Sequence, residues 1–259
     1  MRIQLTLTPT GYPAVMPLNH HQLAAFIYET VAVTAPEFAN FLHEEGWRPD
    51  QLTDHRFKFF VFSLPDVPRF TFQPNGKSFT EGVVWWQISS PLPEFIEALI
   101  AGLGTQREVR LGQTRFTVSQ VDLLPAPDFA SPMRFIALSP LMVSTTEADT
   151  AGRRIKRYVK ADEELFGELV ATNLRAKYQA LYGTEPEDPT LEFMFDPKYL
   201  AEAGGAESRK VTRLIQYKDT KIKSVLAPFL VQGNPALIEL GWESGFGSAN
   251  SQGFGMAGL

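Results

Sequence analysis

The residues best suited to chemistry lie near the C-terminus, in a glycine-rich stretch (residues 241–256). It reads GWESGFGSANSQGFGM, and its two Gly-Phe-Gly units enclose five residues, four of them polar. Glycine lets the backbone adopt positive φ and approach a ligand closely, and successive N–H groups in such turns bind anions. We therefore predict a loop that contacts a phosphodiester backbone through Gly245, Gly247, Ser248, Asn250, Ser251, Gly253 and Gly255.

A purely structural turn, with its phenylalanines in the core, is the alternative for this stretch. A dinucleotide-binding loop is excluded, because no strand, GxGxxG motif and helix follow one another here.

Two further segments concentrate positive charge in a chain whose net charge is −5. Residues 152–160 (GRRIKRYVK) contain five cationic residues and no acidic one, and residues 208–223 contain six cationic residues and one acidic one. Such segments suit a polyanion, although a charge run can also be a solvated surface. Tyr158 and Tyr217 can stack on bases. The predicted binding cations are Arg153, Arg154, Lys156, Arg157, Arg209, Lys210 and Arg213.

Several classes of chemistry are excluded by composition. The 259 residues contain no cysteine and four histidines, with no HExxH or HxH pair. Thiolate nucleophiles, disulfides and iron–sulfur clusters are therefore ruled out, and we predict neither a metal nor a cofactor. No apolar run approaches the ~18 residues of a membrane span, and the N-terminus alternates like a strand. We expect a cytoplasmic protein without membrane contact.

The strands and helices that position these residues are predicted to follow the same order in each half of the chain. In the first half we expect a strand over 1–9, helices over 20–33 and from Pro36 with Thr34 as its cap, strands over 57–64 and 83–88, a helix over 94–103, and strands near 109 and over 115–123. In the second half we expect a strand over 134–143, a helix over 162–182, strands over 191–195, 211–216 and 222–231, a helix from Asn234 to about 242, and a last strand over 253–259. A proline-containing linker (125–132) separates the halves. The order predicts an α+β protein of two tandem ferredoxin-like βαββαβ domains, over 1–126 and 127–259.

The glycine-rich stretch resembles the C-terminal motif of the CRISPR-associated repeat-processing endoribonucleases of the RAMP superfamily. The similarity extends along nearly the whole chain, through Asn19 and His20 before a helix with FIY (26–28), FLHE (41–44), FKFFVFS (57–63) and ALSP (137–140). The resemblance implies two ferredoxin-like domains and CRISPR repeat RNA as the partner. It also implies metal-independent cleavage of precursor transcripts into guide RNAs, by 2′-hydroxyl attack with a 2′,3′-cyclic phosphate product.

The same resemblance places the catalytic set on Tyr28, His43 and Lys58. Histidine suits proton transfer near neutral pH, and lysine suits stabilisation of a charged transition state. Lys58 alternates with phenylalanines, which predicts a strand face shared with Phe60 and Phe62. Arg56 or His55 are alternatives to the lysine.

Other interpretations remain open at this point. Tyr28 can be a rim aromatic, Lys58 a lysine lying over apolar surface, and His43 a helix-end residue. His20 and His21, before the first helix, suit either capping or RNA contact. The whole chain can be a catalytically silent repeat-RNA binder or structural RAMP subunit, or a small-molecule sensor. Partners to consider besides RNA are other CRISPR effector-complex subunits and a second copy of the chain.

Overall fold

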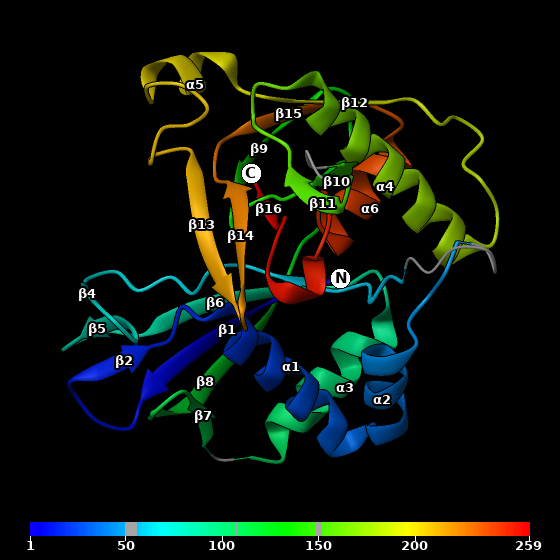
Figure 1. The fold of residues 1–259 in the computed structure, drawn as a ribbon. Helices are drawn as coiled ribbons and strands as arrows, with labels where there is room; N and C mark the ends of the chain where they lie inside the picture. Colours follow the sequence, from blue (N-terminus) through cyan, green and yellow to red (C-terminus); the bar gives the residue numbers. More distant parts are fainter. Residues whose placement is uncertain (50–55, 107, 149–151) are drawn as a thin grey trace. The chain divides into compact units, whose positions relative to one another are not determined.

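The computed structural model describes residues 1–49, 56–106, 108–148 and 152–259 (Figure 1). They form two compact units. Unit 1 consists of Met1–Gly46, Lys58–Pro127 and Ser251–Gly253, and unit 2 consists of Trp47–Phe57, Asp128–Asn250 and Phe254–Leu259. Among the described residues, no helix is long and apolar enough to cross a membrane.

Unit 1 is built on an antiparallel sheet in the order β3-β6-β1-β8-β7. Its strands are β1 (Arg2–Pro9), β3 (Val61–Phe62), β6 (Val84–Ser89), β7 (Val109–Leu111) and β8 (Thr114–Leu124). A smaller sheet contains β2 (Ala14–Met16), β4 (Thr71–Gln73) and β5 (Gly76–Phe79). The helices are α1 (His20–Thr34), α2 (Pro36–Glu44) and α3 (Pro93–Gly104), of which α1 packs against both others (Figure 1). The order β8-β1-β6-β3 is that of a ferredoxin-like βαββαβ unit, as predicted.

Two helices of unit 1 differ in how they begin. The side chain of Asn19 accepts hydrogen bonds from the backbone N–H groups of His21 and Gln22, which makes it the N-cap of α1. Thr34 was expected to cap the next helix, but this prediction is wrong. Thr34 is the last residue of α1 and its hydroxyl donates to Ala98 O, while Ala35 precedes α2 without a side-chain cap.

The expected strand over 57–64 is mostly absent. Only Val61–Phe62 pairs with β6, and Phe57 forms an isolated bridge with Trp47. Phe59 has φ of 50°, a left-handed conformation that takes the backbone out of a strand. Phe59, Phe60 and Phe62 are nevertheless buried, so the hydrophobic run fills the core without forming a ladder. The shared strand face predicted for Lys58 is therefore wrong.

Unit 2 contains a second antiparallel sheet in the order β12-β15-β9-β16. Its strands are β9 (Met133–Ala137), β12 (Leu191–Phe195), β15 (Phe229–Gly233) and β16 (Ala257–Gly258). Two hairpins accompany it, β10–β11 (Ser144–Ala148 and Arg154–Tyr158) and β13–β14 (Thr212–Tyr217 and Thr220–Val225). The helices are α4 (Glu164–Tyr182), α5 (Pro197–Glu202) and α6 (Pro235–Ser244), with a 3₁₀ turn over Asn250–Gln252. The order β16-β9-β15-β12 is again ferredoxin-like, which confirms the predicted fold class.

Two expected strands of unit 2 are divided. The run 134–143 contains β9 and then, after Pro140, an isolated bridge between Leu141 and Val225. The run 222–231 is split into β14 and β15, with Pro228 in the connection, because proline has no N–H to donate to a ladder. The last strand is shorter than expected. The cap at Asn234 is confirmed, since its side chain accepts from the N–H of Ala236.

Candidate functional site

Tyr28, His43 and Lys58 lie together in unit 1. The rings of Tyr28 and His43 meet edge to face with centroids 5.6 Å apart, and the Tyr28 ring also meets that of Phe60, with centroids 5.3 Å apart. Lys58 Nζ donates to the main-chain oxygen of His43 at 2.9 Å. Three residues on α1, α2 and the segment before β3 therefore converge on one cluster.

The imidazole of His43 is the most accessible group of this cluster. It lies in the last turn of α2, and its side chain is 67% exposed. Nδ1 is 2.7 Å from Glu44 Oε1. The carbonyl groups at this end of the helix carry partial negative charge. Lys58 donates to one of them, that of His43, which places a cation beside the imidazole.

Of the two alternatives to Lys58, only one lies among the described residues. Arg56 is described and exposed. His55 lies outside the described residues.

His20 has a structural contact instead of a capping role. It is buried in the first turn of α1, and its Nδ1 is 3.0 Å from the carbonyl oxygen of Gln252 in the glycine-rich stretch. A carbonyl only accepts, so Nδ1 carries a proton and donates it. Burial lowers the pKa of His20 to about 4, which keeps the ring neutral at pH 7. A Cβ on Gly253 would lie 2.6 Å from the Phe62 ring and 2.9 Å from His20 Nδ1, so only glycine fits there.

The glycine-rich stretch divides into a buried frame and an exposed crest. The four glycines of the Gly-Phe-Gly units are buried, and so are Phe246 and Phe254, as a structural turn would have them. The five residues between the units (248–252), which we call the crest, are all partly exposed. Ser248, Asn250 and Ser251 of the predicted contacts thus reach the surface, whereas the predicted glycines shape the loop beneath it.

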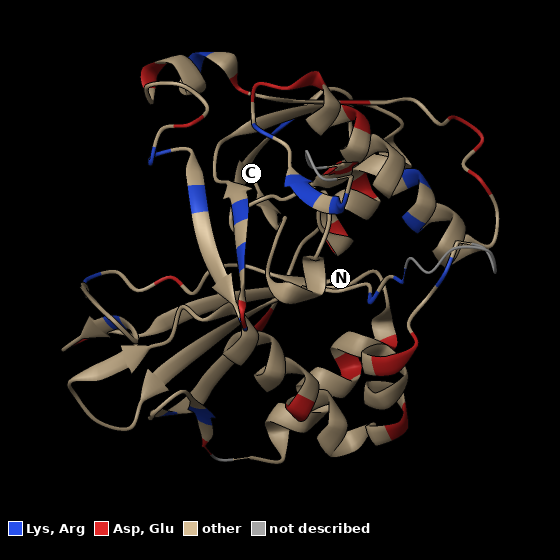
Figure 2. Ribbon diagram, viewed as in Figure 1, with Lys and Arg blue, Asp and Glu red and all other residues tan. Residues whose placement is uncertain are grey.

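The predicted basic segments are the two hairpins of unit 2 (Figure 2). Some of their cations are paired within the protein. Arg157 pairs with Glu147 and Glu163, and Glu207 pairs with both Lys160 and Lys223. The hydrogen bond from Lys223, and then that from Lys160, lowers the pKa of the Glu207 carboxyl. Arg213 turns back onto the carbonyls of Arg209 and Thr212.

The remaining predicted cations of the hairpins point to the surface. Arg154 and Lys156 are exposed, and neither has an ion-pair partner among the residues that the structure describes. The other exposed cations are Arg153, Arg209, Lys210, Lys218 and Lys221. Exposed positive charge is therefore present on both hairpins beside the internal pairs.

One apolar cluster of unit 2 joins both hairpins to the glycine-rich stretch. Its buried members are Met142, Ile222 and Phe254, and packed against them are Tyr158, Ile215, Tyr217 and Ala249. Phe254 and Ala249 belong to the glycine-rich stretch, and the others include residues of both hairpins. Tyr158 and Tyr217, predicted to stack on bases, thus pack their rings against protein, and burial raises the pKa of both phenols.

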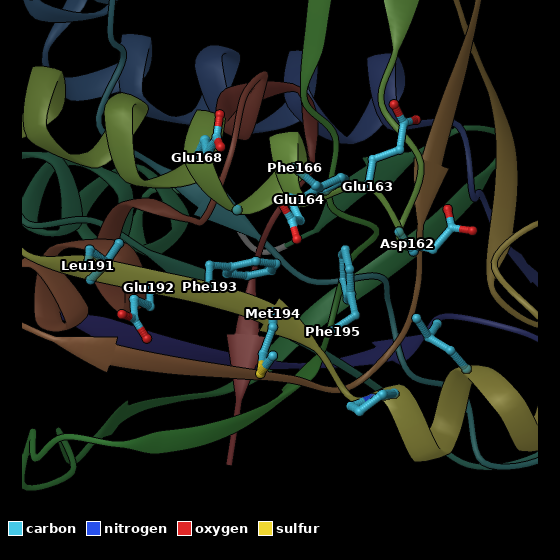
Figure 3. A pocket seen from close by; sticks show the side chains of 14 residues that line it. Asp162, Glu163, Glu164, Phe166, Glu168, Leu191, Glu192, Phe193, Met194 and Phe195 are labelled. Carbon is cyan, nitrogen blue, oxygen red and sulfur yellow. The ribbon is translucent and has the colours of Figure 1, made fainter.

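A separate cavity of about 490 Å³ lies beside α4 and β12 (Figure 3). Its floor is aromatic, with Phe166, Phe193 and Phe195, and its rim carries the carboxylates Asp162, Glu163, Glu164, Glu168 and Glu192. Such a rim repels a polyanion, so we do not place nucleic acid there. Within the described part of the chain, no group of three or more His, Asp or Glu side chains is arranged to hold a metal ion.

Sequence reasoning missed Lys177 on α4, which is 2% exposed. In the sequence it lies between Ala176 and Tyr178, a context that gives no sign that an ammonium group is buried there. It also missed Glu44 as the partner of His43, although the two are adjacent in the chain.

Two ferredoxin-like units, a glycine-rich C-terminal loop and basic hairpins packed on that loop define a tandem ferredoxin-like α+β protein. The family model described as CRISPR associated protein Cas6, C-terminal, matches residues 124–259, and the model for the Cas6 N-terminal part matches residues 15–122. The chain therefore belongs to the Cas6 family of CRISPR-associated proteins.

Individual relatives agree with this assignment. CRISPR-associated endoribonuclease Cas6 1 of Methanocaldococcus jannaschii is 32% identical over 99% of this chain and 91% of its own length. CRISPR-associated endoribonuclease Cas6 of Pyrococcus furiosus is 28% identical over 99% of this chain and 89% of its own length. A solved structure of a CRISPR associated protein Cas6 superposes with a TM-score of 0.78 at 30% identity, covering 100% of this chain and 98% of that one.

Proposed function

We propose that this Cas6-family protein is an endoribonuclease that cleaves CRISPR repeat RNA in precursor transcripts and so releases guide RNAs. The observation that carries the proposal is the cluster in unit 1, where Tyr28, His43 and Lys58 meet around an accessible imidazole. Relatives named as endoribonucleases at 32% and 28% identity support the same activity.

The chemistry we propose needs no metal ion. With Nδ1 donating to Glu44, Nε2 of His43 holds the lone pair and accepts the proton of the 2′-hydroxyl. The 2′-oxygen attacks phosphorus, the bond to the 5′-oxygen breaks, and the proton taken up by Nε2 is delivered to that leaving oxygen. The products are a 2′,3′-cyclic phosphate and a 5′-hydroxyl. Lys58 stabilises the negative charge that develops on the phosphate oxygens, and the Tyr28 hydroxyl holds one of them or the transferred proton.

RNA binding is assigned to unit 2. The unit 2 residues of the crest (248–250) and the exposed cations of the two hairpins are joined through one apolar cluster, which supports a single RNA-binding surface in that unit. We propose residues 1–126 as the catalytic domain and 127–259 as the RNA-binding domain. We further propose a cytoplasmic location, which suits a chain without cysteine, and other effector-complex subunits or a second copy of the chain as additional partners.

The exposed cations of β11 give a measurable test of this surface. Replacing Arg154 and Lys156 together with glutamine should weaken repeat-RNA binding and flatten its salt dependence by about 1.4 to 1.8 logarithmic units per decade, because each phosphate contact contributes about 0.7 to 0.9. Fluorescence anisotropy between low and high salt measures both effects.

The matched control for that variant removes two cations elsewhere in unit 2. Arg134 and Lys198 pair with Asp196 and Glu202, outside both hairpins. Their double glutamine variant has the same net charge and should keep the wild-type salt slope. Equal slopes for the two double variants would remove β11 from the RNA-binding surface.

Cleavage of a repeat RNA by the purified protein in EDTA tests the proposed function itself. We expect one major cut within the repeat. Tight binding without any cut would instead support a silent RNA-binding subunit, and salt-independent or absent binding would support neither.

A further inference from the structure

Lys177 of α4 is buried in unit 2 and surrounded by oxygen acceptors. Its Nζ donates to Gly245 O at 2.5 Å, to Asn250 Oδ1 at 2.7 Å and to Ser244 O at 3.3 Å. Three acceptors match the three N–H groups of an ammonium ion. A neutral amine has only two, so one of these oxygens would then lose its donor.

The two main-chain acceptors, Ser244 O and Gly245 O, belong to the end of α6. Ser244 is the last residue of that helix and Gly245 follows it with φ of 89°, so their oxygens lie at the negative end of the helix dipole. The ammonium ion therefore holds the point where the chain leaves α6 and enters the glycine-rich stretch.

The third acceptor continues the network into the crest. The Asn250 amide Nδ2 donates to Phe254 O at 2.9 Å and lies 3.4 Å from Phe246 O. The Asn250 amide thus donates hydrogen bonds to the phenylalanine carbonyl of each Gly-Phe-Gly unit. The two units are also joined directly, because the N–H of Phe246 donates to Gly255 O. A Cβ on Gly255 would lie 2.0 Å from Phe246 O, so the two units approach each other more closely than other residues allow.

We propose that Lys177, acting through Asn250, is a positioning residue that holds the crest of the glycine-rich stretch in its RNA-binding arrangement. This inference rests on the proposed function, because it assumes that the crest contacts RNA. Burial lowers the pKa of Lys177 to about 7, as expected for a cation removed from water, and the helix end and the asparagine replace its lost solvent. The proposal thus gives a structural role to a buried lysine that does not contact the catalytic cluster.

Lys177→Met is the test variant, since methionine keeps an unbranched side chain and removes only the cationic head. Arg175→Met is its matched control. Arg175 lies on the same helix and donates to Pro189 O and Thr172 Oγ1 near the surface, so both variants lose one positive charge from α4. The measurements are repeat-RNA affinity, the single-turnover cleavage rate at saturating RNA, and amide hydrogen exchange over residues 245–252 in the free protein.

For Lys177→Met we expect an affinity loss of about tenfold or more, the effect of losing hydrogen bonds to a charged group. The cleavage rate at saturating RNA should stay close to that of the wild type, because the catalytic cluster lies in unit 1. Exchange should accelerate over residues 245–252 and not over the other residues of either unit. Asn250→Ala should give the same affinity loss, and the double variant should be no weaker than either single one, because both changes break one network.

Two results would overturn the inference. One is wild-type affinity in Lys177→Met or Asn250→Ala, and the other is a double variant whose loss is the product of the single losses. Should Lys177→Met fail to fold, Asn250→Ala carries the test through hydrogen exchange over residues 245–252 in the free protein, because Asn250 is also a predicted RNA contact and its affinity loss alone does not separate the two roles. Absence of RNA binding by the wild type would defeat the proposed function, whereas wild-type affinity in either single variant, with RNA binding by the wild type intact, would defeat this inference alone.

Discussion

Replacing His43 with alanine should lower the cleavage rate of repeat RNA by about 10²- to 10⁴-fold, the usual contribution of a general acid–base group. RNA affinity should be nearly unchanged. The imidazole is two-thirds exposed at the end of α2, and its removal leaves no cavity in the core. Single-turnover cleavage and a binding titration with the same RNA separate the two effects.

A graded variant refines this prediction. Glu44→Gln keeps a hydrogen-bond acceptor for Nδ1 and removes the charge of an exposed pair, which is worth about 0.2 to 1 kcal/mol. Its cleavage rate should therefore fall less than about fivefold. Full activity in the His43 variant, or an equal loss in both variants, would show that the imidazole is not the proton-transfer group.

Replacing Gly255 with alanine should disrupt the glycine-rich stretch and with it RNA binding. The added Cβ would lie 2.0 Å from Phe246 O and 2.7 Å from Asn250 Nδ2, and the residue has φ of 86°. Overpacking costs about 1–3 kcal/mol and the left-handed conformation about 1–2 kcal/mol, so the free energy of unfolding should fall by about 2–5 kcal/mol. Chemical denaturation and RNA titration measure the two consequences.

Gly205→Ala separates backbone strain from crowding. Gly205 has φ of 93° in unit 2, and a Cβ there meets no atom within 4 Å. This variant should lose only the about 1–2 kcal/mol of the left-handed conformation and should bind RNA normally. If the two alanine variants bind RNA equally well, the close approach of the Gly-Phe-Gly units is not required for recognition.

Much of the fold could be predicted from local pattern. The spacing of Leu23, Ile27 and Val31 defined the buried face of α1, and Asn234 with Pro235 marked the start of α6. The strand predictions failed where a hydrophobic run is buried in the core but pairs with a neighbouring strand over only part of its length. The run around Phe59 is buried yet leaves the sheet through a left-handed residue, and Pro228 lies in the connection that divides the predicted strand 222–231 into β14 and β15.

The candidate sites divide in the same way. The resemblance proposed Tyr28, His43 and Lys58, and the structure brings them into one cluster, although Lys58 reaches it from an irregular segment instead of a strand. Lys177 could not have been found, because burial of a charged side chain depends on acceptors from α6 and the crest. The net charge of −5 argued against RNA binding. The proposed RNA recognition depends instead on the exposed cations of two hairpins, because local charge steers a polyanion.

A repeat RNA carrying a single 2′-deoxy nucleotide immediately 5′ of the scissile phosphate tests the central claim most directly. In EDTA, the protein should bind this RNA as tightly as the unmodified repeat and leave it uncut. It should cut the unmodified repeat to a product that ends in a 2′,3′-cyclic phosphate. Cleavage of the 2′-deoxy substrate at the same position would contradict the mechanism assigned to His43, Lys58 and Tyr28.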